Sequence, residues 1–184
     1  MQTIGDVSRF LARQRHIVDL LRITADIRAA EFWIGAGVLR NAIWDHLHDR
    51  SIDVIFDGDV DVVFFDTADI ASQCDERLEA HLRSLRPEVP WSVHNQARMH
   101  LRNDDAPYRD VQDAIRHWPE TATAIAARWS GSCLEMLAPH GIDDLVQLIV
   151  RPTPEFALKL PQYRARVAAK AWAARWPRLK IMES

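Results

Sequence analysis

The strongest structural signal in the chain lies in two segments, Trp33-Ile-Gly-Ala-Gly-Val-Leu-Arg-Asn41 and Asp59-Val-Asp-Val-Val-Phe-Phe-Asp66. The first segment begins within a short apolar run, from Glu31 to Ile34, that ends in a glycine turn. Apolar residues then return at helical spacing, which predicts a strand, a turn and a helix. The second segment is rich in β-branched and aromatic residues, a composition typical of a buried strand. Together they predict a sheet in which one strand leads through a glycine turn into a helix.

The other elements follow from the same periodicities. Helices are expected over Asp6–Arg28, from a cap at Thr67 or Ser72 to about Leu85, and over Asp110–Trp118, Ile142–Val150 and Glu155–Trp176. A strand is expected over Trp91–Gln96, and a hairpin over Thr121–Trp129 and Ser132–Ala138. Strands that alternate with helices of unequal length predict an α+β (mixed α/β) fold, with a short mixed sheet packed against helices.

Composition indicates one globular domain. The 184 residues are 48% hydrophobic and 27% charged with a net charge of -3, and we expect a single domain over 1–184 in which 155–180 form a C-terminal helical extension. No apolar run is long enough for a membrane span and no signal peptide is recognisable, so we expect a cytoplasmic protein. Cys74 and Cys133 share no metal-ligand spacing. The sequence leaves the oligomeric state open, with a monomer as one option.

Asp59 and Asp61 are the strongest candidates for chemistry. Side chains on a strand alternate between its faces, so these two carboxylates project from the same side, and a divalent cation is the simplest way to offset their repulsion. The turn Gly35-Ala36-Gly37, about twenty residues earlier, opens a helix whose free backbone N–H groups suit a phosphate. The combination predicts a site for phosphoryl transfer. The alternative is the polar face of a half-exposed strand beside an ordinary turn.

The order of these motifs resembles the nucleotidyltransferase fold of the DNA polymerase β superfamily. Further likeness to a bacterial family of uncharacterised nucleotidyltransferase-like proteins is carried by Trp44-Asp-His-Leu-His48, Asn95-Gln-Ala-Arg-Met-His100, Trp118-Pro-Glu-Thr-Ala-Thr-Ala124 and Arg151-Pro-Thr153. The resemblance covers the chain from about Glu31 to Leu179. It implies a minimal nucleotidyltransferase core, with Asp59 and Asp61 as the metal-binding pair and Gly35 and Gly37 at the triphosphate turn.

One feature departs from that superfamily. Its catalytic members usually present a third carboxylate from a neighbouring strand, and the nearest candidate strand, Trp91-Ser-Val-His-Asn-Gln96, contains none. Glu135 would fill this role if the hairpin lies beside Asp59 and Asp61. Otherwise it belongs to the solvated face of its strand.

Each of the other polar groups has two possible roles. Arg40 and Asn41 follow the glycine turn, where they would contact a phosphate or simply solvate the first helical turn. Asn95, Gln96, Arg98 and His100 would recognise a base, a ribose or an acceptor, or form a polar loop network. The C-terminal cations would guide RNA, or form a solvated face on a helix that is docked by its aromatic residues. This set comprises Lys159, Arg164, Arg166, Lys170, Arg175, Arg178 and Lys180.

Three functional hypotheses follow. The first is a nucleotidyltransferase that uses Mg²⁺ or Mn²⁺ to move a nucleoside monophosphate from an NTP to a small-molecule, RNA or protein acceptor. The second is a catalytically silent nucleotide-binding or regulatory module of the same fold, because the third carboxylate is missing. The third is a hydrolase, which would need His94 or His100 beside Asp59.

Overall fold

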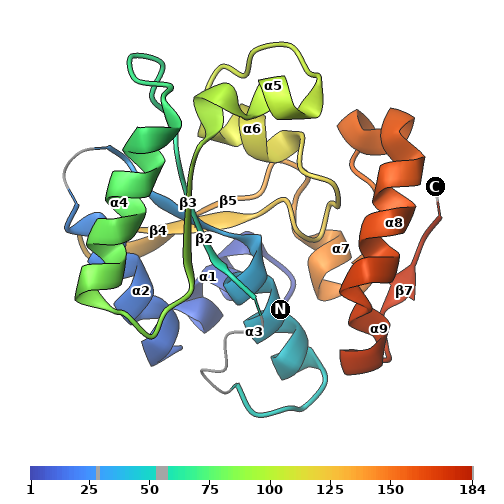
Figure 1. The fold of residues 1–184 in the computed structure, drawn as a ribbon. Helices are drawn as coiled ribbons and strands as arrows, with labels where there is room; N and C mark the ends of the chain where they lie inside the picture. The colour runs from blue at the N-terminus through green and yellow to red at the C-terminus, as the bar shows by residue number, and fades with distance from the viewer. Residues whose placement is uncertain (28–29, 53–57, 184) are drawn as a thin grey trace.

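The computed structural model describes residues 1–27, 30–52 and 58–183, and its centre is a five-stranded sheet (Figure 1). The strand order is β3-β2-β1-β4-β5. The strands are β1 (Trp33–Gly35), β2 (Val60–Phe64), β3 (Trp91–Asn95), β4 (Ala126–Ser130) and β5 (Cys133–Leu137). β2 and β3 are parallel, whereas β1 is antiparallel to both β2 and β4, and β4 is antiparallel to β5. The mixed sheet confirms the predicted fold class.

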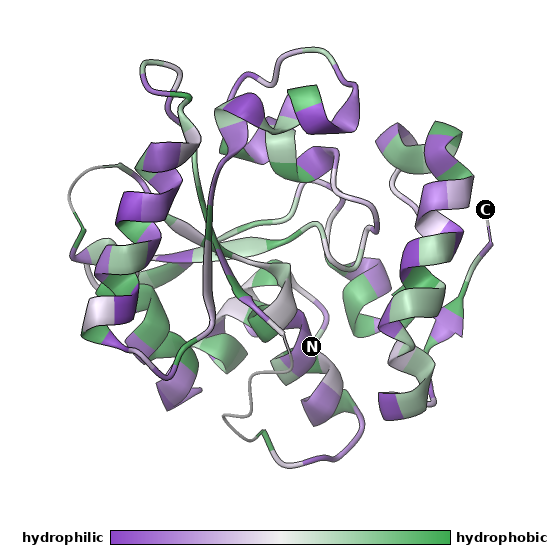
Figure 2. Cartoon of the chain, in the orientation of Figure 1, coloured by the Kyte–Doolittle hydropathy of each residue, from purple (hydrophilic) through white to green (hydrophobic). Residues whose placement is uncertain are grey.

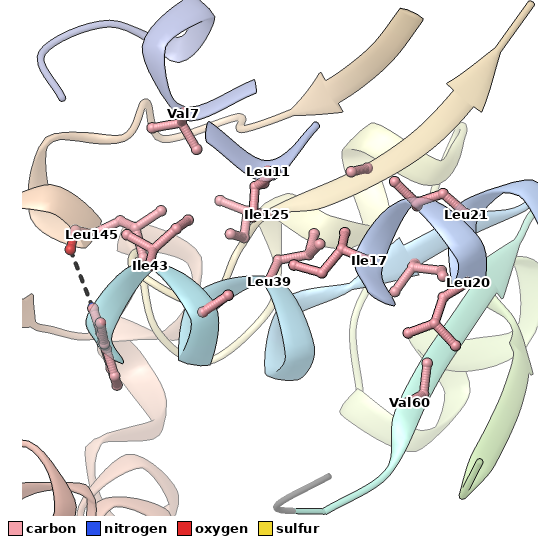
Figure 3. Packing of buried hydrophobic residues seen from close by; sticks show 14 of the residues in the cluster. Val7, Leu11, Ile17, Leu20, Leu21, Leu39, Ile43, Val60, Ile125 and Leu145 are labelled. Atoms are coloured by element: carbon pink, nitrogen blue, oxygen red, sulfur yellow. Dashed lines mark hydrogen bonds between the residues drawn. The ribbon is translucent and has the colours of Figure 1, made fainter. Parts of the chain in front are cut away.

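The main hydrophobic core lies between this sheet and the helices before β3. These helices are α1 (Ile4–Leu11), α2 (Arg15–Ala25), α3 (Ala36–Leu47) and α4 (Ser72–Leu85). Figure 3 shows Leu39 and Ile43 of α3 among side chains of the N-terminal helices and of Ile125. Trp44, completely buried, donates a hydrogen bond from Nε1 to the carbonyl of Leu145 at 3.1 Å. This packing holds the start of α3 in a defined position against the sheet.

The opposite face of the sheet carries a smaller core under the α5–α6 region. Trp33 and Val63 of the sheet pack there against Val111 and Ile115 of α6 (Val111–Arg116). The 3₁₀ helix η1 (Gln96–Arg98) and α5 (Met99–Asn103) connect β3 to this region. Asp61 lies on the same face as Val63, because the two residues are two positions apart on one strand. Asp61, the candidate residue within β2, therefore faces the α5–α6 region.

The N-terminal helix predicted over Asp6–Arg28 is two helices, and its expected end at Arg28 lies outside the described residues. α1 ends at Leu11 and α2 begins at Arg15, because α1 packs against β5 whereas α2 packs against β4 and β1. The cap predicted for α4 is also wrong. Ala71 occupies the capping position without a side-chain hydrogen bond. Asp66 acts as a turn residue after β2, since its Oδ1 accepts a hydrogen bond from the backbone N–H of Ala68 at 2.8 Å.

The C-terminal third departs most from the sequence-based prediction. The helix expected over Ile142–Val150 is short α7 (Asp143–Val146) followed by strand β6 (Ile149–Val150), because Leu148 takes a left-handed φ of 61°. The final helix is divided into the 3₁₀ helix η2 (Pro154–Lys159), α8 (Leu160–Lys170) and α9 (Trp172–Arg175), with a second left-handed residue, Ala171, at the break. Strand β7 (Lys180–Ile181) then pairs in parallel with β6. The expected helical extension is thus a helix-and-strand unit.

Aromatic side chains dock this unit onto the rest of the molecule, as one of the two readings of the basic segment predicted. Tyr163, Trp172 and Trp176 are all buried, and both tryptophan rings meet Trp44 edge-on. Figure 2 shows that hydrophilic and hydrophobic residues alternate along α8. In the part of the chain that the structure describes, no helix has the length and apolar character needed to cross a bilayer. The cytoplasmic location and the single-domain boundaries stay predictions.

Candidate active site

The glycine turn and the aspartate pair lie against each other. Gly35 ends β1 and precedes α3 in an extended conformation. A Cβ atom added to it would lie 3.4 Å from the Cβ of Asp61 and 2.7 Å from Cη2 of Trp118, whereas one added to Gly37 would lie 3.6 Å from the carbonyl oxygen of Asp59. The antiparallel pairing of β1 with β2 produces this arrangement. Two motifs that are separated in sequence therefore meet where α3 begins.

The two aspartates have different environments. Asp59 is exposed just before β2, whereas Asp61 is partly buried and lines a cavity of about 340 Å³. Burial raises the pKa of the Asp61 carboxyl above its ordinary value, and Asp59 adds to this effect, while His94, Arg166 and Lys170 act in the opposite direction. The pair is therefore a site where a cation would relieve an unfavourable local charge.

The cavity is formed by residues from distant parts of the chain. Ala36 at the start of α3, Asp61 of β2 and His94 of β3 line it from the sheet side. Thr123, which lies just before β4, and Arg166 of α8 also line it. Its remaining polar lining residues are Gln96, Arg102, Asn103 and His117. A carboxylate, a helix start and a cation thus surround one space, which suits a phosphate-containing ligand with a metal ion.

The neighbouring strand β3 presents a hydroxyl, not a carboxylate, beside Asp61. Ser92 of β3 stands opposite Asp61 in the parallel register, and His94 stands opposite Val63. The Ser92 hydroxyl and Nε2 of His94 are hydrogen-bonded at 2.9 Å. His94 lines the cavity together with Asp61, whereas His100 bonds to the carbonyl of Ala97 through Nδ1. The hydrolase hypothesis required a histidine beside Asp59, which is not among the residues that line this cavity.

Glu135 does not join the aspartate pair. It lies on β5, which pairs with β4, so β4 and β1 separate it from β2. Its carboxylate accepts a hydrogen bond from Nε of Arg128 at 2.8 Å. The condition for its role as a third ligand, a hairpin beside Asp59 and Asp61, is not met. Over residues 1–27, 30–52 and 58–183, no group of three or more His, Cys, Asp or Glu side chains is arranged to hold a metal ion.

The donor set fits a hard cation that keeps other ligands. Two carboxylates, one of them exposed, match the way Mg²⁺ and Mn²⁺ are usually held together with substrate phosphates and water. Asp59 and Asp61 are the residues of this chain that would hold such an ion.

Arg40 and Asn41 lie outside the cavity lining. Arg40 is buried, with its guanidinium 5.0 Å from the ring centre of Trp44 and 4.6 Å from that of Trp172. Its Nη2 donates to Oδ1 of Asn41 at 2.8 Å. This guanidinium therefore connects α3 to the C-terminal unit.

The polar segment from Asn95 to His100 is mainly a structural network, the second of its two interpretations. Asn95 is fully buried and donates from Nδ2 to the carbonyl of Asp66 at 2.7 Å. Arg98 donates from Nη1 to Asp75 at 2.9 Å. Of the four residues predicted for substrate binding, Gln96 alone lines the cavity beside Asp61.

Sequence reasoning missed the contribution of the C-terminal segment to this cavity. Arg166 belongs to a basic run that the sequence presents as either an RNA guide or a solvated face, yet it lines the cavity with Asp61. Its Nε donates to Oε1 of Glu120 at 2.7 Å, and Glu120 is completely buried. An unusual acid beside apolar neighbours in Trp118-Pro-Glu-Thr-Ala-Thr-Ala124 was the available signal.

Comparison with known proteins decides the family. A family model described as nucleotidyltransferase matches residues 22–181. This chain belongs to that nucleotidyltransferase family. Among solved structures, this nucleotidyltransferase is similar to a protein whose NMR structure is described as revealing a CCA-adding enzyme head domain. That match has 30% identity and a TM-score of 0.87, and it covers 100% of this chain and 98% of the other.

Larger enzymes share the fold. An apo CCA-adding enzyme matches at 13% identity with a TM-score of 0.61, covering 97% of this nucleotidyltransferase and 43% of that chain. The Thermotoga maritima CCA-adding enzyme complexed with tRNA matches at 11% identity with a TM-score of 0.59, covering 100% and 43%. The present chain thus spans less than half the length of these two enzymes. No curated protein matches it.

Proposed function

We propose that this nucleotidyltransferase uses a divalent metal, Mg²⁺ or Mn²⁺, to move a nucleoside monophosphate from an NTP to a hydroxyl group of an acceptor. The observation that carries the proposal is that the glycine turn lies against Asp59 and Asp61, and that Ala36 of this turn and Asp61 line one cavity at the start of α3. In the proposed reaction the acceptor oxygen forms a bond to the α-phosphorus, and the bond between the α-phosphorus and the oxygen that bridges it to the β-phosphorus breaks. Pyrophosphate leaves, and the acceptor proton passes to solvent.

The residues have distinct proposed roles. Asp59 and Asp61 hold the metal, which supplies charge neutralisation at the phosphate oxygens when bound. Gly35, Ala36 and Gly37 present backbone N–H groups at the helix start to the phosphates. Gln96 lies on the cavity wall, where it can bind the base, the ribose or the acceptor. An RNA acceptor stays among the candidates because one structural neighbour is described in complex with tRNA.

We expect Asp59→Asn and Asp61→Asn each to weaken metal-dependent NTP binding by at least about ten-fold, because each removes a negative ligand. Isothermal calorimetry with NTP, with and without Mg²⁺, measures the effect. Asp66→Asn is the matched control, since Asp66 lies just beyond the same strand and its bond to Ala68 survives in an amide. Unchanged NTP binding in both test variants would show that the site is wrongly assigned.

The second candidate is a silent nucleotide-binding module of the same fold. It is favoured by Ser92, whose hydroxyl stands opposite Asp61 where a third carboxylate would be expected. Release of pyrophosphate from NTPs mixed with pooled acceptors separates the two functions. Sustained, metal-dependent release that Asp61→Asn abolishes excludes the silent module, whereas tight NTP binding without release supports it.

A further inference from the structure

Arg166 reaches the cavity from the C-terminal unit as an oriented cation. Its side chain is 37% exposed, so the guanidinium is neither buried nor fully solvated. Nε donates to Glu120 at 2.7 Å, and this bond occupies one of the five N–H donors of the guanidinium. Arg166, Asp61 and Ala36 at the start of α3 all line the same cavity. An anion in this space would meet a planar donor group and a helix start together.

Glu120 is held in place from several directions. Its second oxygen, Oε2, accepts a hydrogen bond from Oγ1 of Thr123 at 2.6 Å, and its backbone forms a bridge with Pro152. Thr153 donates from Oγ1 to the carbonyl of Trp118 at 2.8 Å, which joins the same two segments. Burying a carboxylate with a cation seldom increases stability over an apolar pair, because desolvation costs several kcal/mol per ion. A rigid, fully buried acid facing Arg166 is therefore better explained as a device that orients the guanidinium.

Arg166 also balances the charge of the cavity. Asp61 alone would repel a polyphosphate, and Arg166, which lines the same cavity, offsets that repulsion.

We propose that α8 forms the phosphate-binding wall of the site, in which Arg166, oriented by Glu120, binds the triphosphate tail of the NTP and the pyrophosphate that leaves. This inference rests on the proposed function and assigns its anion subsite. The basic C-terminal segment is then part of the nucleotide site. Arg166 contacts the ligand, and Glu120 is a positioning residue.

The direct test measures binding of inorganic tripolyphosphate to the full chain by calorimetry, with and without Mg²⁺. Arg166→Ala is expected to weaken binding by about ten-fold or more, because hydrogen bonds to charged groups are the strong ones. Arg166→Lys keeps the charge but loses the planar donor pair, so its affinity for tripolyphosphate is expected to lie between those of the wild type and of Arg166→Ala. Arg164→Ala is the matched control, because Arg164 is exposed on the same helix and does not line the cavity.

A double-mutant cycle tests the role of Glu120. Glu120→Gln is expected to weaken tripolyphosphate binding in the wild-type background and to have no further effect in Arg166→Ala. An equal loss in both backgrounds would mean that Glu120 acts only on general stability, and would overturn its positioning role. If Glu120→Gln does not fold, Arg166→Lys carries the test, since wild-type affinity in that variant would overturn a requirement for an oriented guanidinium.

The failure of this inference is distinguishable from failure of the proposed function. If Arg166→Ala binds tripolyphosphate and NTP like the wild type while Asp61→Asn still abolishes metal-dependent NTP binding, the phosphate wall is wrong and the transferase site stands. If the wild type binds neither NTP nor tripolyphosphate with Mg²⁺ present, both are overturned.

Discussion

Gly35 and Gly37 belong to one turn but have different surroundings. A methyl group on Gly35 would lie 2.7 Å from the Trp118 ring, too close for a real contact, whereas one on Gly37 would meet the carbonyl of Asp59 at an ordinary 3.6 Å. Gly35 is therefore required by close packing, while Gly37 is not. The sequence motif treats the two glycines alike, and the ring that distinguishes them comes from more than eighty residues later in the chain.

We expect Gly35→Ala to lower the free energy of unfolding by about 1–3 kcal/mol, because Trp118 must move to accommodate the methyl group. Gly37→Ala is its matched control. It lies inside α3 and should leave stability unchanged or raise it by less than about 1 kcal/mol, since alanine favours helix. Urea denaturation followed by circular dichroism measures both. Equal losses in the two variants would contradict the packing explanation.

Individual elements depend on local hydrogen bonds that the sequence partly reveals. The first turn of α1 is a capping box, in which Oγ1 of Thr3 accepts from the N–H of Asp6 and the Asp6 carboxylate accepts from the N–H of Thr3. The N–H of Gln2 also donates to this carboxylate, at 2.9 Å. These backbone donors, together with Arg9, lower the pKa of Asp6 to about 2.

A pH dependence of α1 follows. Because the pKa of Asp6 falls from 3.8 to about 2 on folding, its carboxylate stabilises the helix start above pH 3.8, and the contribution is lost as the pH falls toward 2. NMR titration of the Asp6 side chain and of the Gln2 and Thr3 amides should show this transition. Asp6→Asn should remove it. An Asp6 that titrates at its ordinary pKa would refute the capping arrangement.

At the scale of the whole molecule, α9 and α3 are joined by a compact polar and aromatic contact. Trp176 is 1% exposed, and its Nε1 donates to Oδ1 of buried Asp45 at 2.8 Å. Arg175 donates to the other oxygen of the same carboxylate at 2.9 Å. The wall that bears Arg166 is therefore anchored to the helix that follows the glycine turn, and we expect the sheet and the C-terminal unit to unfold together.

Trp176→Ala should lower the free energy of unfolding by about 3–5 kcal/mol, the usual cost of removing a buried large aromatic side chain. Tryptophan fluorescence and circular dichroism should still report one coincident transition. Leu158→Ala is the control in the same unit, because Leu158 is 96% exposed and its removal should have no effect. Two separate transitions in the wild-type protein would contradict joint unfolding.

Local patterns were sufficient for the strand, glycine turn and helix from Trp33 and for the strand that carries Asp61, because alternation and helical periodicity act over a few residues. They were insufficient for the broken C-terminal helix, since its end depends on the left-handed Ala171 and on strand pairing with β6. The site divides in the same way. The aspartate pair can be recognised from the sequence as a motif. The position of Arg166 at the cavity depends on its contact with buried Glu120, and the distance of Glu135 from the pair depends on the order of the strands in the sheet. These positions depend on contacts between distant parts of the chain, which a short stretch of sequence does not reveal.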